Sequence, residues 1–507
     1  MRTSISKKLL CTFYSFSILL AFVASFTGCS RAFNATQQYP KEKLQDDYRL
    51  FRNILEDAHP SLYWYTTKDS LDYYFDEGYR RIADSMTEPQ FRTLLSYTIS
   101  KIDCGHTSVR SSKKYSKYID TARLPQFPLG IKFWDDSAVV YTNLDRHSLL
   151  IRGTMIKAIN HTPINVIRDS LFQYMVMDGY STNHKYQSLS NLGNFGGLYQ
   201  SVYGANKLFN IDYVDSTGAE KNTTITLYDI RTDTAYNKFL HSFRKTTKKE
   251  RKRNALFNTR NIQVDTTGST AYMTVTTFSN GNKLKSFFRS SFRLLDDHQI
   301  KNLIIDVRTN GGGNVELSGK LTQYIINHRF KLADSLYAIR RLSSYEKYIQ
   351  NTLPAFFFMN FVTKKRSDGM YHFGYFERHY FTPKSTHHFN GNVYILTGGN
   401  SFSATTLFAN ALKGQSNVKL VGEETGGGAY GNTAWFIPDA TLPNTHVRFR
   451  LPRFHMVMNR NFPKNGRGII PDIEVKPSTE AIRRGYDVKM EFVKKLIDST
   501  KVNGVKN

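Results

Sequence analysis

Two serines stand between an apolar run and a helical segment, at a position where a hydroxyl can act as a nucleophile. Tyr394–Leu396 predict a short strand, Gly398-Gly399 allow a sharp turn, and Ser401 and Ser403 follow. A hydroxyl at a helix N-terminus faces unpaired backbone amides and the positive end of the helix dipole, which stabilises an alkoxide and a neighbouring oxyanion. A serine that only caps the helix fits the same position, so other parts of the chain must decide between the two interpretations.

A histidine that could serve such a nucleophile occurs far upstream. His106 follows a predicted helix that begins at Thr87 and that Gly105 can end, which leaves the histidine on the connection to a β segment. An imidazole can accept a serine proton near neutral pH and return it to a leaving amine. If the chain has no nucleophile, a structural role explains His106 as well as a catalytic one does. The same holds for His59, which is also isolated in the sequence.

An oxyanion site is predicted at a triple-glycine turn. Leu303–Val307 predict a buried strand, and Gly311-Gly312 follow it with backbone amides that no side chain covers. Together with the amide of Ala404, they would flank a carbonyl group attacked by Ser403. The turn lacks the Lys-Ser/Thr ending of a phosphate loop.

From Thr270 onward the chain repeats one pattern. In this pattern an apolar strand leads into a glycine-rich turn. The strands are Ala271–Phe278, Leu303–Val307, Tyr394–Leu396 and Val418–Val421, and the last one leads into Gly426–Gly428. This order predicts an α/β core in which several turns meet at one edge of a sheet. Residues 266–476 are the expected catalytic core and 477–507 a helical tail.

The remaining chain divides into three further parts. Helical periodicity from Leu44 predicts an N-terminal helical segment over 40–118, and residues 119–235 show alternating β segments. The hairpin Gly153–Ile164 resembles the central strands of a PDZ domain, a module that binds peptides by adding them to a sheet edge, although an ordinary β domain fits too. A basic linker is expected at 236–265.

The N-terminus predicts export and lipidation. Basic residues precede the apolar stretch Leu9–Phe26, and Thr27-Gly28-Cys29 follows. Small residues before a cysteine resemble the lipobox of bacterial lipoproteins, with Phe26 in place of the usual aliphatic residue. We therefore expect a signal peptide over 1–29, lipidation of Cys29, a tether over 30–39 and a body facing the periplasm or the cell surface. An uncleaved membrane anchor is the alternative.

The charge and cysteine content narrow the possible partners. The formal net charge of +27 favours acidic surfaces such as anionic lipid, while the export signal and the lack of a binding motif argue against nucleic acid. Cys104 is the one cysteine outside the signal and the lipidation position, so disulfides are not expected. His387-His388 has no partners at metal-site spacing, and neither a metal nor another cofactor is predicted.

Four motifs in order resemble the C-terminal processing peptidases and their tricorn-core relatives. They are Leu303–Gly313, Asn400–Ala404, Val421–Thr425 and Gly468–Val475, within a resemblance from about Leu44 to Val475. The resemblance implies a crotonase-like spiral core, with the nucleophile at Ser403 rather than Ser401.

Departures from that family pattern are also informative. Processing peptidases pair the serine with a lysine where this chain has Gly428, and they carry a glutamate where it has Thr406. The tricorn-like branch takes its base from a histidine, and Cys104-Gly105-His106-Thr107 resembles that motif. The third residue stays open among three candidates or none: Glu423, Glu424 and Asn465.

The sequence thus predicts a serine endopeptidase that uses Ser403 and His106 on peptides or unfolded proteins. A catalytically silent peptide-binding lipoprotein is one alternative. An α/β-hydrolase-type esterase is another, with Ser401 as nucleophile, Asp439 as acid and His446 or His455 as base. The insertion Asn327–Asn390 is interpreted as a lid or substrate wall, or as a local core under a long loop.

Overall fold

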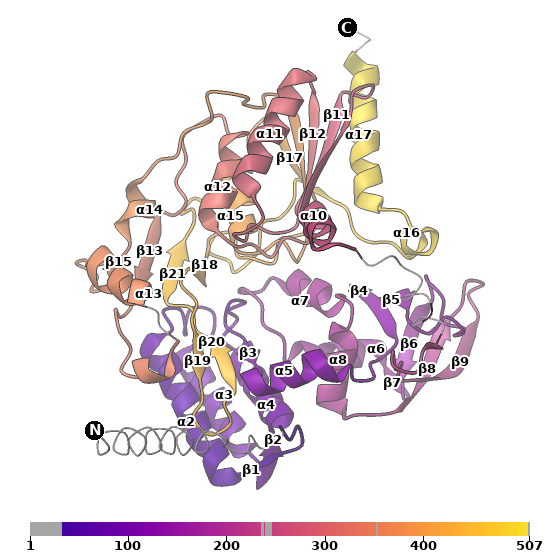
Figure 1. The fold of residues 1–507 in the computed structure, drawn as a ribbon, viewed down its shortest axis with the longest axis vertical. Coiled ribbons are helices and arrows are strands. Elements are labelled where there is room, and N and C mark those ends of the chain that lie inside the picture. Colours follow the sequence, from indigo (N-terminus) through magenta and orange to yellow (C-terminus); the bar gives the residue numbers. More distant parts are fainter. Residues whose placement is uncertain (1–32, 235–237, 239–245, 351–352, 505–507) are drawn as a thin grey trace, which may run out of the picture. The chain divides into compact units, whose positions relative to one another are not determined.

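A six-stranded sheet carries the turns that are expected to hold the site (Figure 1). The structure is a computed structural model, and it describes residues 33–234, 238, 246–350 and 353–504. The strands lie in the order β10 (Arg260–Asp265), β11 (Thr270–Val275), β12 (Asn302–Asp306), β16 (Asn392–Thr397), β17 (Val418–Gly422) and β22 (Ile473–Glu474). The neighbours from β11 to β22 are parallel, and β10 is antiparallel to β11. The parallel strands therefore bring the turns after β12, β16 and β17 to one edge. Residues 260–265, expected in the linker, belong to this sheet.

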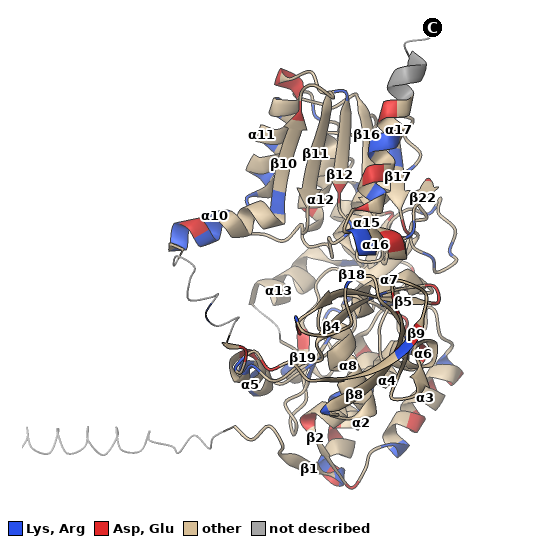
Figure 2. Cartoon of the chain, turned by 90° about the vertical axis from the view of Figure 1, so that its right-hand side faces the viewer, with Lys and Arg blue, Asp and Glu red and all other residues tan. Residues whose placement is uncertain are grey.

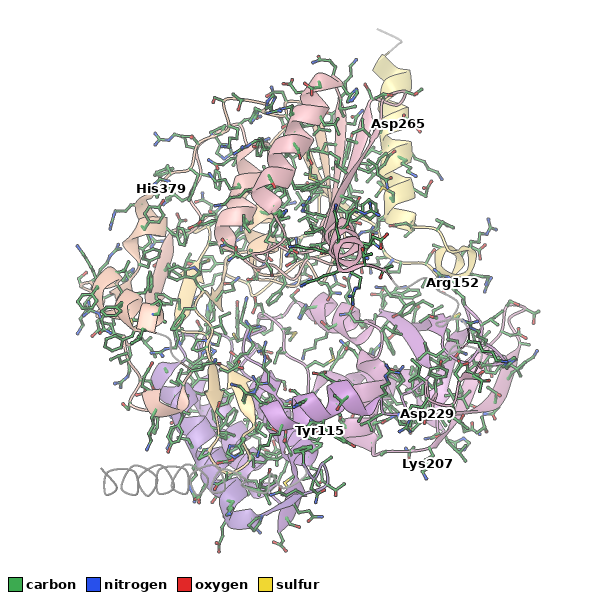
Figure 3. All side chains as sticks on the ribbon, viewed as in Figure 1. Tyr115, Arg152, Lys207, Asp229, Asp265 and His379 are labelled. Carbon is green, nitrogen blue, oxygen red and sulfur yellow. The ribbon has the colours of Figure 1, made fainter. Side chains whose placement is uncertain are left out.

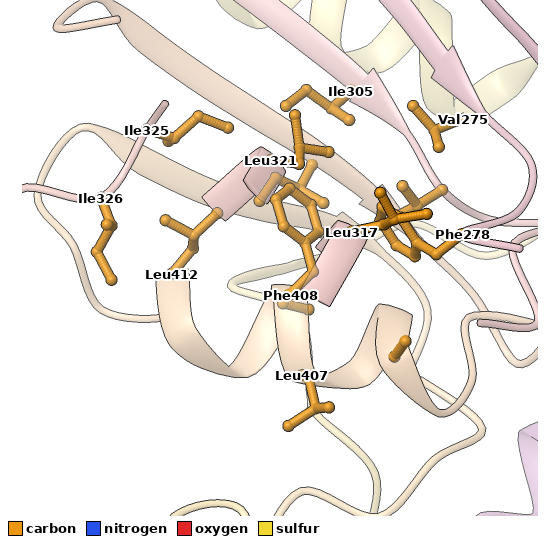
Figure 4. Packing of buried hydrophobic residues seen from close by; sticks show 14 of the residues in the cluster. Val275, Phe278, Ile305, Leu317, Leu321, Ile325, Ile326, Leu407, Phe408 and Leu412 are labelled. Atoms are coloured by element: carbon orange, nitrogen blue, oxygen red, sulfur yellow. The ribbon is translucent and has the colours of Figure 1, made fainter. Parts of the chain in front are cut away.

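Helices cover both faces of the sheet (Figure 1). The helices on one face are α11 (Leu284–Asp297), α12 (Val315–Gln323) and α15 (Ala404–Leu412), and α17 (Val488–Gly504) lies on the other. Ile305, Leu321 and Phe408 pack together on the first face (Figure 4). Ile304 and Val493 pack on the second. Burial on both faces explains why the sequence of β12 is almost continuously apolar.

Two smaller sheets form the opposite wall of the site. One has the order β14 (Lys364–Lys365), β15 (Tyr371–His372), β13 (Ser335–Ala338), β21 (Phe454–Val457) and β18 (Gly431–Ala434). The other has the order β19 (Asp439–Thr441), β20 (Arg448–Arg450) and β3 (Val109–Arg110). The insertion 327–390 contributes three strands to the first of these sheets, together with α13 (Leu353–Phe357), a π-helical turn (Phe358–Val362), α14 (Gly374–Arg378) and a 3₁₀ turn (Glu346–Tyr348).

The N-terminal segment is helical, as expected, and joins the core through a strand. Its elements are β1 (Gln38–Pro40), α2 (Lys41–Ala58), α3 (Lys68–Arg80), β2 (Ser85–Thr87), α4 (Glu88–Ser100) and α5 (Lys113–Ala122). Helix α4 ends at Ser100, five residues before Gly105, so the expectation that Gly105 terminates the helix was wrong. His106 does lie on the connection to a strand, because β3 begins at Val109 and pairs with β20.

Residues 126–228 form a separate antiparallel sheet with helices. Its elements are β4 (Leu129–Trp134), β5 (Ser137–Asn143), β6 (Met155–Ile159), β7 (Thr162–Pro163), α6 (Ile164–Phe172), α7 (Thr182–Leu189), α8 (Asn194–Tyr203), β8 (Leu208–Val214) and β9 (Glu220–Thr226). Helix α7 reaches the catalytic core, because Gln187 donates a hydrogen bond to Glu423 and Asn183 donates one to the carbonyl of Glu424. The guanidinium of Arg152 (Figure 3) bonds the carbonyl of Ile482 in α16 (Thr479–Arg484).

The basic stretch upstream of the core forms α10 (Lys248–Thr259), which has no buried residue. Figure 2 shows its lysines and arginines in the first half of the helix, whereas most of the second half is tan. Within the described part of the chain, no helix has the length and apolar character needed to span a bilayer. The expected signal peptide and Cys29 lie outside the described residues.

Candidate active site

The two serines in the turn after β16 have clearly different surroundings. Ser401 is fully buried, and its hydroxyl donates to the carbonyl of Val307 at 2.8 Å and accepts from the amide of Gly398 at 3.2 Å. Ser403 caps α15 with φ +57° and ψ −119°, and its hydroxyl makes no hydrogen bond with any described residue. A positive φ on a serine stores backbone strain and is characteristic of functional turns. Ser403 is therefore the free hydroxyl, whereas Ser401 holds the turn together.

Ser403 opens into a cavity of about 830 Å³. Polar and apolar residues both line the cavity. The polar lining includes His106, His184, Asn400 and the three glycines 311–313. The apolar lining, called the apolar wall below, includes Val315, Leu407, Trp435, Phe436, Ile437 and Met456. A concave site with a few convergent polar groups can bind an extended peptide with an apolar side chain.

The glycine turn supplies fewer free amides than expected. The amide of Gly312 donates to the side chain of Asn310 at 2.9 Å, so we correct its expected role as an oxyanion donor. Gly312 has a steric role instead, because a Cβ on it would lie 2.7 Å from the carbonyl oxygen of Phe402 and 2.8 Å from Cβ of Ser403. The amides of Gly311 and Ala404 make no hydrogen bond with any described residue. These two are the donors available for an oxyanion.

His106 shares the cavity with Ser403 but is not exposed, since only 4% of its surface is accessible. Its ring packs on Phe402, with the ring centres 4.7 Å apart. Neither ring nitrogen of His106 makes a hydrogen bond with a described residue, and the hydroxyl of Ser403 is included in this statement. Catalytic hydrogen bonds in ligand-free structures are often long and tighten on substrate binding, so the lack of this hydrogen bond is compatible with a Ser–His pair.

The carboxylate beside His106 belongs to Asp178, which the sequence analysis missed. Its Oδ1 lies 3.8 Å from Nδ1 of His106 and accepts the amide of Gly105 at 2.8 Å, while Oδ2 has no partner among the described residues. Asp178 is 2% exposed. Its position favours the tautomer of His106 with the proton on Nδ1, which leaves Nε2 free to act as the base. The one local signal was the Asp-Gly turn sequence, which predicts a turn and not a partner.

The three residues considered for this role lie elsewhere. Glu423 is buried against the ammonium of Lys489 and the amide of Gln187. Glu424 accepts the amide of Gly468 at 2.7 Å and pairs with a guanidinium, and Asn465 is exposed and accepts the amide of Arg467 at 3.0 Å. In the described structure, none of the three contacts His106.

A second histidine, also missed from the sequence, lines the cavity. His184 of α7 packs its ring on Phe402 at 4.8 Å, and its Nδ1 bonds the carbonyl of Gly399 at 2.7 Å. Because a carbonyl can only accept, Nδ1 carries the proton and Nε2 is unprotonated. Burial lowers the pKa of His184 below its ordinary value. His184 is therefore a neutral imidazole that fixes the turn before Ser401.

The residues proposed for an α/β-hydrolase do not gather around Ser401. The carboxylate of Asp439 pairs with Arg448 at 2.7 Å. His455 bonds the hydroxyl of Ser61 at 2.6 Å, and His446 is exposed. Ser401 itself has both hydrogen-bonding capacities of its hydroxyl occupied, so this set forms no Ser–acid–His site.

The insertion reaches the cavity through three aromatic contacts with Trp435, which lines the cavity. Phe373 stacks on Trp435 at 4.7 Å, and Phe358 and Phe376 pack edge-on against it at 5.0 and 5.6 Å. Phe361, three residues after Phe358, is 72% exposed. The insertion thus supports the apolar wall from behind and also presents an apolar surface to solvent.

Comparisons with known proteins agree with this architecture. Residues 269–475 match the model of peptidase family S41. A search of curated proteins gave no match. Among solved structures, mature CPAF complexed with lactacystin is similar at 13% identity with a TM-score of 0.61, covering 91% of this chain and 98% of that one. The CPAF S499A mutant is similar at 12% identity with a TM-score of 0.60, covering 90% and 96%. At such identities the structural likeness shows the fold alone.

Proposed function

We propose that this chain is an S41-type endopeptidase that uses Ser403 as nucleophile and His106 as base. The match of residues 269–475 to the model of peptidase family S41 supports the reaction class. The observation that carries the proposal is the single cavity that is lined by the strained Ser403, by His106 and by Gly311, whose amide is free. The free amide of Ala404 directly follows Ser403 in the chain. The core is proposed to have the crotonase-like spiral fold, in which these turns meet.

The proposed reaction begins with proton transfer. As Oγ of Ser403 attacks the peptide carbonyl carbon, Nε2 of His106 takes the hydroxyl proton, and Asp178 orients the ring and stabilises its positive charge. The carbonyl π electrons move to oxygen, and this oxyanion is stabilised by the amides of Gly311 and Ala404. Loss of one such donor typically costs about 2.7–4 kcal/mol of transition-state stabilisation.

Three further proton transfers complete the cycle. The tetrahedral intermediate collapses, the carbon–nitrogen bond breaks, and His106 gives its proton to the leaving amine. Water then attacks the acyl-enzyme while His106 takes a proton from it, and Ser403 leaves with that proton restored. All groups that this scheme needs are supplied by the described chain.

The sheet of residues 126–228 is proposed to act as a PDZ-like module. Strands β4 and β9 are its edges, and an extended peptide could pair with an edge strand. Helix α7, which follows β6 and α6 in this region, touches the turn before Ser401 through His184 and Gln187. A peptide held by this region would therefore lie near the catalytic cavity.

The cellular setting is proposed from the sequence. The export pattern and Cys29 support a lipoprotein anchored in the cell envelope, which would act on exported proteins or peptides. If Cys29 is the lipidation site, Cys29→Ser will abolish incorporation of labelled fatty acid, and unchanged incorporation would contradict the assignment.

Labelling with a fluorophosphonate tests the catalytic assignment. The full chain in detergent should be labelled, Ser403→Ala should not, and Ser401→Ala should keep labelling because its hydroxyl only supports the turn. His106→Ala should lose labelling together with cleavage of unfolded casein, whereas His184→Ala should retain part of both. Labelling that survives in Ser403→Ala and disappears in Ser401→Ala would overturn the proposal.

A further inference from the structure

One positively charged side chain lines the catalytic cavity, and it has no partner. Arg450 is the last residue of β20, and its backbone amide donates to the carbonyl of Ser108, two residues after His106. Among the described residues that line the cavity, Arg450 is the sole lysine or arginine, and none is aspartate or glutamate. The guanidinium of Arg450 makes no hydrogen bond or ion pair with any described residue. The cavity therefore carries an uncompensated positive charge.

The nearest carboxylate is already shared by two other arginines. Asp439 is the cross-strand neighbour of Arg450. Its Oδ2 pairs with Arg448 at 2.7 Å and its Oδ1 with Arg110 at 3.5 Å. Both oxygens of Asp439 are thus engaged by other guanidinium groups, and none of the described hydrogen bonds or ion pairs joins Asp439 to the side chain of Arg450. Burial and the charge of Arg110 lower the pKa of Arg450 below its ordinary value, although the charge of Asp439 acts in the opposite direction.

A half-buried guanidinium without a counterion costs free energy, because part of its hydration is lost and not replaced. A ligand that supplies the missing negative charge offsets this cost. A planar guanidinium fits a carboxylate through two parallel hydrogen bonds, which lysine cannot reproduce. We propose that Arg450 binds a carboxylate of the substrate, supplied by an aspartate or glutamate side chain or by a peptide C-terminus. This inference rests on the proposed peptidase function.

The position of Arg450 gives the carboxylate a defined place relative to the scissile bond. Arg450 and Ser403 line the same cavity, and the strand that carries Arg450 is joined to the segment that carries His106. The bound carboxylate would therefore lie within a few residues of the cleaved peptide bond. The apolar wall near Trp435 and Met456 remains available for a neighbouring apolar side chain.

Matched peptides provide the test. A peptide that the enzyme cleaves is made with glutamate or glutamine at each position near the cleavage site, and with a free or an amidated C-terminus. A charge-assisted pair predicts that one carboxylate raises kcat/KM by about ten- to hundredfold over its amide. The glutamate series and the C-terminal series distinguish a side chain from a terminus as the source.

Variants then connect this preference to Arg450. Arg450→Gln should reduce the preference to within about twofold, Arg450→Lys should keep part of it, and Arg450→Glu should instead favour a lysine-containing peptide. Arg484→Gln, which removes an exposed guanidinium outside the cavity, should leave the preference unchanged. Equal cleavage of carboxylate and amide peptides by the unaltered enzyme would overturn the inference while leaving the peptidase function intact.

A binding measurement separates the two proposals when no peptide is cleaved. Ser403→Ala carrying Arg450 should bind the carboxylate peptide more tightly than the amide peptide in fluorescence anisotropy, and adding Arg450→Gln should remove the difference. Absence of both cleavage and fluorophosphonate labelling would contradict the Ser403 mechanism. Equal binding of the two peptides would contradict the role of Arg450.

Discussion

Replacing Asp178 by asparagine gives a direct test of how His106 is activated. The exchange keeps the shape of the side chain and the oxygen that accepts the amide of Gly105, and it removes one negative charge. That charge lies 3.8 Å from Nδ1 of His106, and both residues are buried. With an effective dielectric constant of about 20, its interaction with an imidazolium is worth about 4 kcal/mol. Since about 1.36 kcal/mol corresponds to a tenfold change in rate, we expect kcat to fall about a thousandfold.

The assay is steady-state cleavage of one peptide by the full chain, with thermal unfolding measured in parallel. KM should stay within about threefold and the melting temperature nearly unchanged, because the lost interaction develops only as His106 becomes charged. Glu424→Gln is the matched control, since it also converts a carboxylate to an amide near the catalytic motifs but contacts Arg467 instead. If Asp178→Asn keeps kcat within tenfold while Glu424→Gln loses it, the assignment of Asp178 is refuted.

Three further predictions follow from packing and charge. Gly312→Ala should abolish peptide cleavage, because its Cβ would collide with the backbone at Phe402, whereas Gly311→Ala, with no atom within 4 Å of its Cβ, should remain active; equal loss in both would contradict the steric argument. Asp103→Asn should be more stable than the unaltered protein at pH 7. Burial raises the pKa of Asp103 from 3.8 to about 6, so the unfolded chain releases this proton first, and the folded state loses up to about 3 kcal/mol as the pH rises from 4 to 6. The stability gain, measured by urea unfolding, should vanish at pH 4, and a gain independent of pH would refute this cause. Lys489→Met should destabilise the protein by about 3–5 kcal/mol, because it leaves Glu423 buried with one neutral partner. Adding Glu423→Gln should restore most of that loss in the same unfolding assay, and no recovery would contradict an electrostatic origin.

The serine turn was predictable from the sequence because its determinants are local. The apolar strand, the glycine pair and the helix around Ser403 lie within about twenty residues, and their spacing alone predicts where a hydroxyl meets free amides. The strand before Gly311 was recognised in the same way. What the spacing could not show is that the amide of Gly312 is taken by Asn310. That bond depends on the side-chain chemistry of Asn310, because an asparagine often accepts the amide two residues further on, and the spacing of apolar residues and glycines does not contain this information.

Asp178 could not be found in this way, because its role depends on contacts between distant segments. Asp178 accepts the amide of Gly105 across 73 residues of chain, and no periodicity or motif relates the two. The same holds for Arg450, whose lack of a partner becomes visible only once Arg448 and Arg110 are seen to share Asp439. Side chains that are defined by the pairing of separate sheets remain outside the reach of local patterns.

The backbone near the second glycine loop supports the proposal that a histidine is the base. Gly428 forms a bridge with Gly468, and a Cβ on Gly428 would lie 2.5 Å from the carbonyl oxygen of Gly431. A lysine at this position, as in the processing peptidases that the motifs resemble, would therefore require the loop to move. The base must come from another wall of the cavity. Nδ1 of His184 makes a hydrogen bond with the carbonyl of Gly399, and no described carboxylate bonds the ring of His184. By contrast, Nδ1 of His106 lies beside Asp178, and Nε2 of His106 has no partner among the described residues. The crowding at Gly428 and the presence of Asp178 are two independent observations that support the proposal of His106 as base.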